Sequence, residues 1–143
     1  MKYQKIGLLL VFMTIWTSSF GQVSESNKTD PGLSAMMVRI AAIEIDSNYV
    51  DEYMAILKEE SKASVSLEPG VICIFPMFQK ENPTQIRLLE IYANKEAYAS
   101  HLQTPHFKHY KETTKEMVKD LKLIDMGSID SETMPEIFRK IMN

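Results

Sequence analysis

Three histidines, His101, His106 and His109, fall within the ten-residue segment HLQTPHFKHY, where a Thr-Pro step separates the first from the other two. Imidazole titrates near neutral pH without perturbation, so a histidine beside a pocket can serve as a base or a proton donor. The same side chains could instead bind a metal ion, or could hydrogen-bond the backbone of a helix junction. The spacing of the three histidines bears on which chemistry to expect.

A metal site needs converging ligands, and the sequence argues against convergence. Thr104 and Pro105 are typical of an N-cap and the first residue of a new helix, which places His101 on an earlier helix than His106 and His109. No HExxH or CxxC spacing accompanies them. We therefore expect no metal site.

An acid-base role requires only one or two imidazoles beside a pocket. His101 is the leading candidate because it shares the inner stripe of its short helix with Tyr98. His106 begins the next helix, where the helix dipole disfavours the charged imidazolium and keeps the ring neutral. His109 directly precedes the inward-facing Tyr110, so we expect it to be exposed to solvent. Hydrogen bonding of His101 and His106 to the loop backbone remains the alternative.

Glu90 is the second polar candidate for catalysis. It lies in the middle of an apolar strand, two residues before Tyr92, and a carboxylate in such surroundings needs a partner or has a raised pKa. A salt bridge with Arg39 or Arg87 across the sheet is the structural alternative to a catalytic role.

Aromatic residues are placed where they could line a cavity between a sheet and its helices. Six are in such positions: Phe75, Phe78, Tyr92, Tyr98, Phe107 and Tyr110. All of these except Phe78 are candidates for contact with a substrate. The same side chains could equally form ordinary hydrophobic core.

Hydrophobic periodicity and turn signals predict the elements that must position these residues. We expect strands at 36–46, 71–79, 86–93 and 121–130, and helices at 49–67 and 95–103. A further helix should begin at Thr104-Pro105, with an apolar stripe that faces the sheet and consists of Phe107, Tyr110, Met117, Val118 and Leu121.

The order β-α-β-β-α-α-β predicts a ferredoxin-like α+β fold, the split βαβ arrangement with helices on one face of a four-stranded antiparallel sheet. Pro76 interrupts the second strand and cannot donate to a central ladder, so this strand should lie at an edge. We assign Arg39, Arg87, Leu89 and Ile91 to the opposite sheet face. Pairing of two such faces would produce a homodimer with a barrel-like interior, a dimeric α/β barrel.

The first 21 residues are typical of a signal peptide. Lys2 and Lys5 precede the uncharged apolar stretch 6–16, which is shorter than the roughly 20 residues of a membrane-spanning helix, and small residues lead up to Gly21. We expect cleavage after Gly21 and export to the periplasm or the exterior without a stable membrane anchor. An uncleaved anchor is the alternative.

Composition limits the partners of the exported chain. Loss of residues 1–21 removes two lysines and no acids, which moves the formal charge from −3 to −5 and does not suggest nucleic acid or an anionic membrane surface as a partner. Cys73 is the only cysteine, so no disulfide within the chain is possible. We interpret 22–35 as a flexible lead-in, 36–130 as the domain, and 131–143 as an amphipathic tail that docks on a groove or a partner subunit.

Several short motifs occur together in the middle of the chain. They are Glu-Pro-Gly-Val at 68–71, Glu-x-Tyr at 90–92, Ala-x-x-x-His at 97–101 and Thr-Pro-His-Phe at 104–107. In this combination the segment resembles the antibiotic biosynthesis monooxygenase family, the quinol monooxygenase-like proteins. With the first strand and helix included, the resemblance covers about 36–130.

The resemblance implies a dimer of ferredoxin-like subunits whose sheets pack into a barrel, each with a pocket between sheet and helices. It also implies a cofactor-independent monooxygenase that oxidises a small aromatic or quinol-type substrate with dioxygen. His101 carries over as the functional histidine, with His106 as its neighbour and Glu90 and Tyr92 on the pocket wall. Such a base would remove a phenolic proton, and the anion would then reduce dioxygen directly.

The family's other activities are less compatible with these residues. A haem-degrading branch depends on a tryptophan beside the haem, whereas Trp16, the only tryptophan, lies in the predicted signal peptide. An isomerase of a small sugar-like substrate would need cationic groups in the pocket, and our strand assignment places none there. A non-catalytic module that binds a small hydrophobic ligand is the alternative from another functional class.

Overall fold

A computed structural model of the chain describes residues 35–130 and 132–142. Its elements are β1 (Met37–Ile45), the 3-10 turn η1 (Ser47–Tyr49), α2 (Val50–Leu67), β2 (Val71–Gln79), β3 (Asn82–Tyr92), α3 (Lys95–His101), α4 (Pro105–Thr113), β4 (Val118–Met126) and α5 (Thr133–Met142). The predicted signal peptide, and all of the predicted lead-in except its last residue, lie outside the described residues. Within the described part of the chain, no helix is long and apolar enough to cross a membrane.

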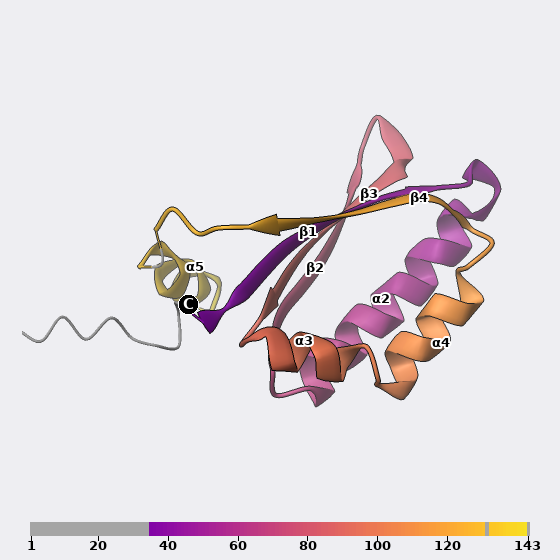
Figure 1. Ribbon diagram of the computed structural model, residues 1–143. Coiled ribbons are helices and arrows are strands. Elements are labelled where there is room, and N and C mark those ends of the chain that lie inside the picture. The colour runs from indigo at the N-terminus through magenta and orange to yellow at the C-terminus, as the bar shows by residue number, and fades with distance from the viewer. Residues whose placement is uncertain (1–34, 131, 143) are drawn as a thin grey trace, which may run out of the picture.

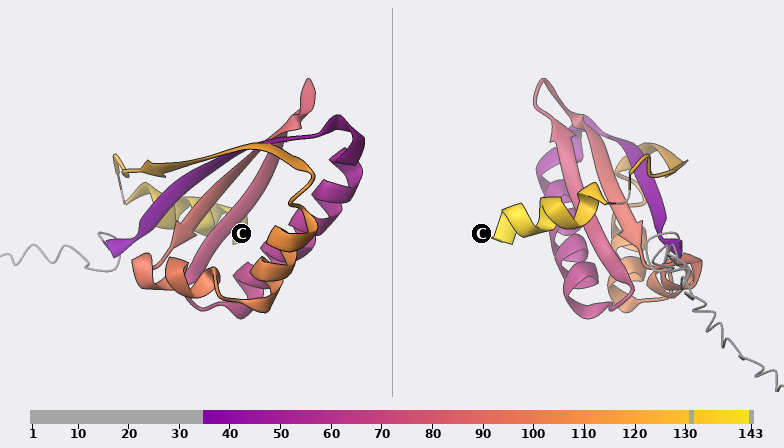
Figure 2. Two further views of the ribbon diagram at one scale, coloured as in Figure 1. Left: turned by 45° about the vertical axis from the view of Figure 1, so that its right-hand side comes forward. Right: turned by 90° about the vertical axis from the view of Figure 1, so that its left-hand side faces the viewer.

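The four strands form one antiparallel sheet in the order β2-β3-β1-β4. Helices α2, α3 and α4 lie together below one face of it, whereas α5 lies apart from this layer (Figure 1). Two further views show α2 and α4 running side by side (Figure 2). This is the predicted ferredoxin-like fold, and β2, which carries Pro76, is an edge strand as expected.

Local sequence signals determine the two helix breaks around α3. The side chain of Asn94 accepts a hydrogen bond from the Ala97 backbone N–H at 2.8 Å, which caps the start of α3. Thr104 in turn caps α4, with Pro105 in its first turn. Gly70, just before β2, lets α3 approach closely, because a Cβ at this position would lie 2.5 Å from the Cβ of Ala97.

Several predicted element boundaries were wrong. Helix α4 ends at Thr113, so Met117, Val118 and Leu121 are not part of its stripe, and β4 already begins at Val118. Antiparallel pairing with β1, in which Val118 lies opposite Ile45, determines this boundary, and the apolar spacing alone could not reveal it. Similarly, β3 begins at Asn82 because the hairpin with β2 pairs Gln79 with Asn82.

The strand register corrects the predicted face of one arginine. Arg39 lies directly opposite Glu90 across β1 and β3, and directly paired residues point to the same face of a sheet. Arg39 therefore lies on the helix-covered face, not on the opposite face as predicted. Alternation along β1 agrees, because Ala41 and Ile43 are buried on that same face.

The opposite sheet face, called the open face below, carries apolar side chains that this single chain leaves exposed. Those at least two-fifths exposed are Phe75, Met77, Ile124 and Met126. Helix α5 likewise leaves Ile137, Phe138 and Ile141 exposed. Apolar surface gathered in this way is typical of a face that packs against another molecule.

Candidate functional site

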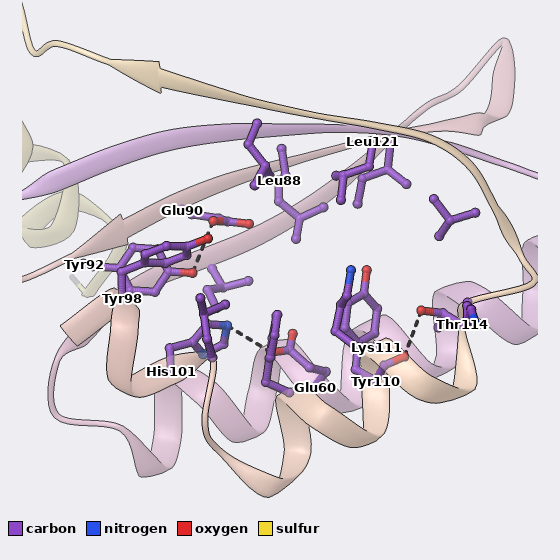
Figure 3. Close-up of a pocket in the computed structure, with 18 residues that line it drawn as sticks. Glu60, Leu88, Glu90, Tyr92, Tyr98, His101, Tyr110, Lys111, Thr114 and Leu121 are labelled. Atoms are coloured by element: carbon purple, nitrogen blue, oxygen red, sulfur yellow. Dashed lines mark hydrogen bonds and ion pairs between the residues drawn. The ribbon is translucent and has the colours of Figure 1, made fainter. Parts of the chain in front are cut away.

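A cavity of about 700 Å³ lies between the helix-covered face of the sheet and helices α2, α3 and α4 (Figure 3). Its apolar wall includes Ala41, Ile43, Ile74, Leu88, Leu121 and Leu123. Its aromatic residues are Tyr92, Tyr98, Phe107 and Tyr110, and its polar residues are Glu60, Glu90, His101, Lys111, Thr114 and Lys115. A mostly apolar cavity with a few converging polar groups has the character of a small-molecule site.

His101 is the last residue of α3 and is only 3% exposed. Its Nδ1 lies 3.0 Å from Glu68 Oε1, and its Nε2 lies 3.8 Å from Glu60 Oε1. The Phe107 ring centroid is 4.6 Å from that of the imidazole. When Nδ1–H donates to Glu68, Nε2 is left with a free lone pair on the cavity side, which is the arrangement of an oriented base.

Glu60, on α2, is a buried acid that sequence reasoning missed. Its side chain is 5% exposed and accepts a hydrogen bond from Ser64 Oγ at 2.8 Å. Burial is the largest influence and raises its pKa above the ordinary value. Helical spacing could have indicated that Glu60 is buried. It follows Tyr53 by seven residues and precedes Ser64 by four, so it shares a helix face with these two fully buried residues.

Glu90 faces the cavity without a basic partner. The Tyr92 hydroxyl donates to its Oε2 at 3.2 Å, and among the described residues no basic group forms an ion pair with it. Arg39, one proposed partner, binds Asp125 through Nε at 2.8 Å and lies over the Tyr98 ring at 4.6 Å from the centroid. Burial raises the pKa of Glu90, so this carboxyl group retains its proton more readily than an exposed one.

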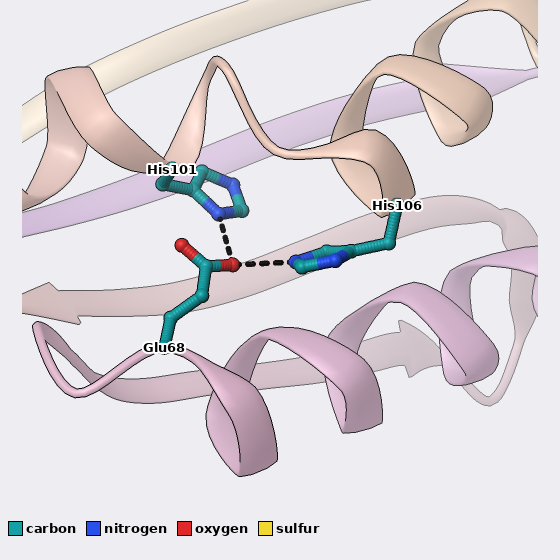
Figure 4. Close-up of side chains that lie close together, drawn as sticks. All are labelled: Glu68, His101 and His106. Carbon is teal, nitrogen blue, oxygen red and sulfur yellow. Dashed lines mark hydrogen bonds and ion pairs between the residues drawn. The ribbon is translucent and has the colours of Figure 1, made fainter.

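Glu68, at the C-cap of α2, joins the two histidines of the Thr-Pro segment (Figure 4). His106 Nε2 lies 2.6 Å from the same Oε1 atom that His101 contacts. The expectation that the helix break keeps these two histidines apart was wrong, because the turn at Thr104 brings both rings onto one carboxylate. Burial alone would raise the pKa of Glu68, but the hydrogen bonds from the two imidazoles outweigh it and lower that pKa.

Sequence reasoning gave Glu68 no functional role and treated it only as part of a helix stop and a family motif. No local pattern points to its partners, which lie 33 and 38 residues further along the chain. One carboxylate with two imidazoles is a donor set that a divalent metal ion accepts. His106 is not on the cavity wall, and His109 is exposed as predicted.

Four of the five predicted substrate contacts, Tyr92, Tyr98, Phe107 and Tyr110, line the cavity. Phe75 does not, because it is 57% exposed on the open face. The register of β2 shifts between Val71 and Cys73, so a bulge reverses the alternation and turns Ile74 toward the helices in place of Phe75. Without this irregularity, Phe75 would share the face of Val71.

Tyr110 is held in place by a second buried phenol. Its hydroxyl lies 2.6 Å from that of Tyr53, which is completely buried on α2. Burial is the main cause that raises the pKa of Tyr110, to about 12. Tyr110 is therefore neutral at physiological pH and can serve as a hydrogen-bond donor, not as a base.

Two lysines on the cavity wall were also missed. Lys111 and Lys115 lie near the carboxyl end of α4, and Figure 3 shows Lys111 reaching toward the cavity beside Tyr110. Neither lysine belongs to the apolar stripe that the sequence predicted for this helix. They give the wall of the same cavity positive charge in addition to its two carboxyl groups, Glu60 and Glu90.

Comparison with known proteins agrees with this geometry. A family model described as antibiotic biosynthesis monooxygenase matches residues 36–113. A protein of Bacteroides thetaiotaomicron, provisionally named an antibiotic biosynthesis monooxygenase, has a similar crystal structure with 47% sequence identity and a TM-score of 0.68, covering 69% of this chain and 94% of its own. No curated protein sequence matches significantly.

Two more distant structures are also similar. A protein of Lactobacillus acidophilus, provisionally named a monooxygenase, is 30% identical with a TM-score of 0.64, and the match covers 65% of this chain and 44% of that one. A Nitrosomonas europaea protein is 20% identical with a TM-score of 0.63, and the match covers 66% and 91%. At that identity the last likeness concerns the fold alone.

Proposed function

The chain belongs to the antibiotic biosynthesis monooxygenase family, and from that premise we propose that it oxidises a small aromatic or quinol-type substrate with dioxygen and needs no bound cofactor. The observation that carries the proposal is the setting of His101. Its ring is buried and oriented through Nδ1 by Glu68, while Nε2 faces a cavity with apolar and aromatic walls.

In the proposed reaction, His101 Nε2 takes the phenolic proton of the substrate. The resulting anion transfers one electron to dioxygen, and the substrate radical and superoxide combine through a new C–O bond. Protonation of the peroxide allows the O–O bond to break as the ring carbon loses its hydrogen, which forms a carbonyl and releases water. One oxygen atom enters the product and the other leaves in water, so a phenol becomes a quinone. The proton returns to the peroxide from the His101 imidazolium or from the Glu90 carboxyl group.

The protein's contribution is to remove a proton, to orient the ring and to exclude bulk water. The four cavity aromatics, Tyr92, Tyr98, Phe107 and Tyr110, offer stacking surfaces for a planar substrate. Burial raises the pKa values of Glu60 and Glu90, which disfavours negative charge on these two carboxyl groups beside a phenolate.

We further propose that the protein is exported and acts as a homodimer. Residues 1–21 support export, with cleavage after Gly21, because two lysines are followed by an apolar stretch and then by small residues. The exposed apolar side chains of the open face support pairing of two sheets into a barrel.

Lys111 and Lys115 favour a second candidate, the isomerase of a small anionic sugar-like substrate, because they supply the cations that this reaction needs. Oxygen consumption separates the two, since an isomerase uses none. A non-catalytic binding module differs from both, because it would retain one ligand per chain without turnover, which native mass spectrometry detects.

The decisive experiment is oxygen uptake by metal-stripped protein with a panel of quinols and phenols. We expect wild type to consume one dioxygen per quinone formed. The rate of His101→Ala should be at least about 100-fold lower, because a general base usually contributes this much. His109→Ala is the matched control, because this histidine is exposed on α4, and it should keep the wild-type rate. Equal rates for wild type and His101→Ala would rule out His101 as the base.

A further inference from the structure

The end of α2 and the junction between α3 and α4 bring three potential metal ligands to one point. Glu68, His101 and His106 each offer one ligand atom, and these atoms all lie within 4.8 Å of one another. Each comes from a different helix, so the convergence depends on the tertiary fold. Two imidazoles and one carboxylate form a ligand set that Zn²⁺ and similar divalent ions bind, with water in the fourth position.

The cluster is sheltered but can be reached from solvent. The exposed fraction of the side chain rises from 3% for His101 to 11% for Glu68 and 20% for His106. An ion can therefore enter past His106 and keep a water ligand on that side. Without an ion, the two imidazole nitrogens lie 3.0 and 2.6 Å from Glu68 Oε1. Ligand atoms bound tetrahedrally at ~2.0–2.1 Å from zinc lie about 3.3 Å apart, so the ligand atoms of the cluster, which are up to 4.8 Å apart, must adjust their positions to bind an ion.

The surroundings of His101 resemble those of a metal-bound histidine. Such a histidine usually donates its second ring N–H to a carboxylate or a carbonyl, which fixes its tautomer. On the side away from the cluster, His101 Nε2 lies 3.8 Å from Glu60 Oε1. Glu60 is itself buried and held by Ser64, so a carboxyl group lies just beyond hydrogen-bond distance of that nitrogen.

We propose that Glu68, His101 and His106 form a binding site for one divalent transition-metal ion, with Zn²⁺ as the model ion, and that the bound ion inhibits the enzyme. Metal on Nδ1 requires the imidazole proton to be on Nε2. The lone pair that would accept the substrate proton is then lost, and Nε2 becomes a donor. Inhibition rests on the proposed monooxygenase function, whereas metal binding does not.

The first test measures binding to the tag-free, metal-stripped protein. Titration with Zn²⁺ in a calorimeter, and with Co²⁺ followed by visible absorption, should show one ion per chain. Glu68→Gln and His106→Gln should each weaken binding by at least about 10-fold, because even the loss of an outer hydrogen-bond partner of a metal ligand costs that much. His109→Gln should bind as wild type does, because His109 is exposed and outside the cluster.

Circular dichroism confirms that each variant folds, and His106→Gln serves alone if Glu68→Gln does not fold. Absence of binding to wild type, or unchanged affinity in the folded cluster variants, would overturn the site.

The second test adds Zn²⁺ to the oxygen-uptake assay, where we expect loss of activity in wild type and resistance in His106→Gln. Metal binding without any loss of activity would overturn the inhibition. If the metal-stripped protein consumes no oxygen with any substrate, the proposed function fails and the metal site is judged by binding alone.

Discussion

His101 and Glu68, 33 residues apart in the chain, meet with Nδ1 3.0 Å from Oε1. This contact joins the end of α3 to the end of α2 and turns the other imidazole nitrogen toward the cavity. Glu68 is not on the cavity wall, so in the proposed reaction it would act through His101 and not on a substrate. We regard it as a positioning residue for the base.

Glu68→Ala should therefore lower kcat and leave KM nearly unchanged. We expect a loss on the order of 10- to 100-fold, smaller than for His101→Ala, because the base remains but its tautomer and orientation are no longer fixed. Glu68→Gln should recover part of the rate, since its amide oxygen can still accept from Nδ1–H. Steady-state kinetics with metal-stripped protein measures both constants. A rise in KM with unchanged kcat would argue against positioning.

Glu90→Gln should stabilise the fold at neutral pH. Burial raises the pKa of Glu90 and outweighs the hydrogen bond from Tyr92 and the electrostatic influence of His101 and Arg39, which lower it. As pH rises above about 4.5, the unfolded chain releases this proton while the folded chain still holds it, so the stability of wild type falls with rising pH up to the raised folded pKa. The glutamine variant lacks this loss and keeps an acceptor for Tyr92.

Urea unfolding between pH 4 and pH 8 checks the sign. The free energy of unfolding of Glu90→Gln minus that of wild type should grow with pH. Glu81→Gln, in the exposed β2-β3 turn, is the control and should give no comparable trend. A difference that shrinks as pH rises would mean that Glu90 is stabilised as a carboxylate in the folded protein.

Tyr110→Phe should destabilise the fold by about 1–3 kcal/mol, because it leaves the buried hydroxyl of Tyr53 without its partner. Removal of both hydroxyls, in Tyr53→Phe with Tyr110→Phe, should cost less than the sum of the two single changes. Urea denaturation of all four proteins completes a double-mutant cycle. Strict additivity would show that the 2.6 Å contact contributes nothing.

Phe75→Lys should convert the proposed homodimer to a monomer. Phe75 is exposed on the open face, and a charge there would have to be buried between two sheets. Sedimentation velocity reports the change in mass. Leu67→Lys is the matched control, because Leu67 is also apolar and exposed but lies at the end of α2, in the helix layer. A variant that stays dimeric would mean that the interface lies elsewhere.

Much of the architecture could be predicted because its signals are local. The largely apolar run of β1, the Pro-Gly stop after Glu68 and the Thr-Pro cap of α4 each depend on neighbouring residues. The edge position of β2 also followed locally, since a proline without an N–H is excluded from a central ladder. These signals led to the correct fold class.

Predictions that depended on long-range pairing were less successful. The start of β4, the face of Arg39 and the exposure of Phe75 are determined by the register of one strand against another. A single bulge between Val71 and Cys73 reverses the faces of the residues that follow. Nothing local to Phe75 marks it as outward-facing.

In the candidate site, too, some residues could be identified from local sequence and others only from the tertiary structure. Residue type and helical position were enough to single out His101, and the apolar surroundings of Glu90 were enough to mark it as unusual, because both signals lie within one element. Only the tertiary structure brings Glu60 and Glu68 to opposite sides of the His101 ring and places His106 on the same carboxylate. Contacts between residues more than 30 positions apart arise when helices pack on a sheet, and no periodicity along the chain encodes them.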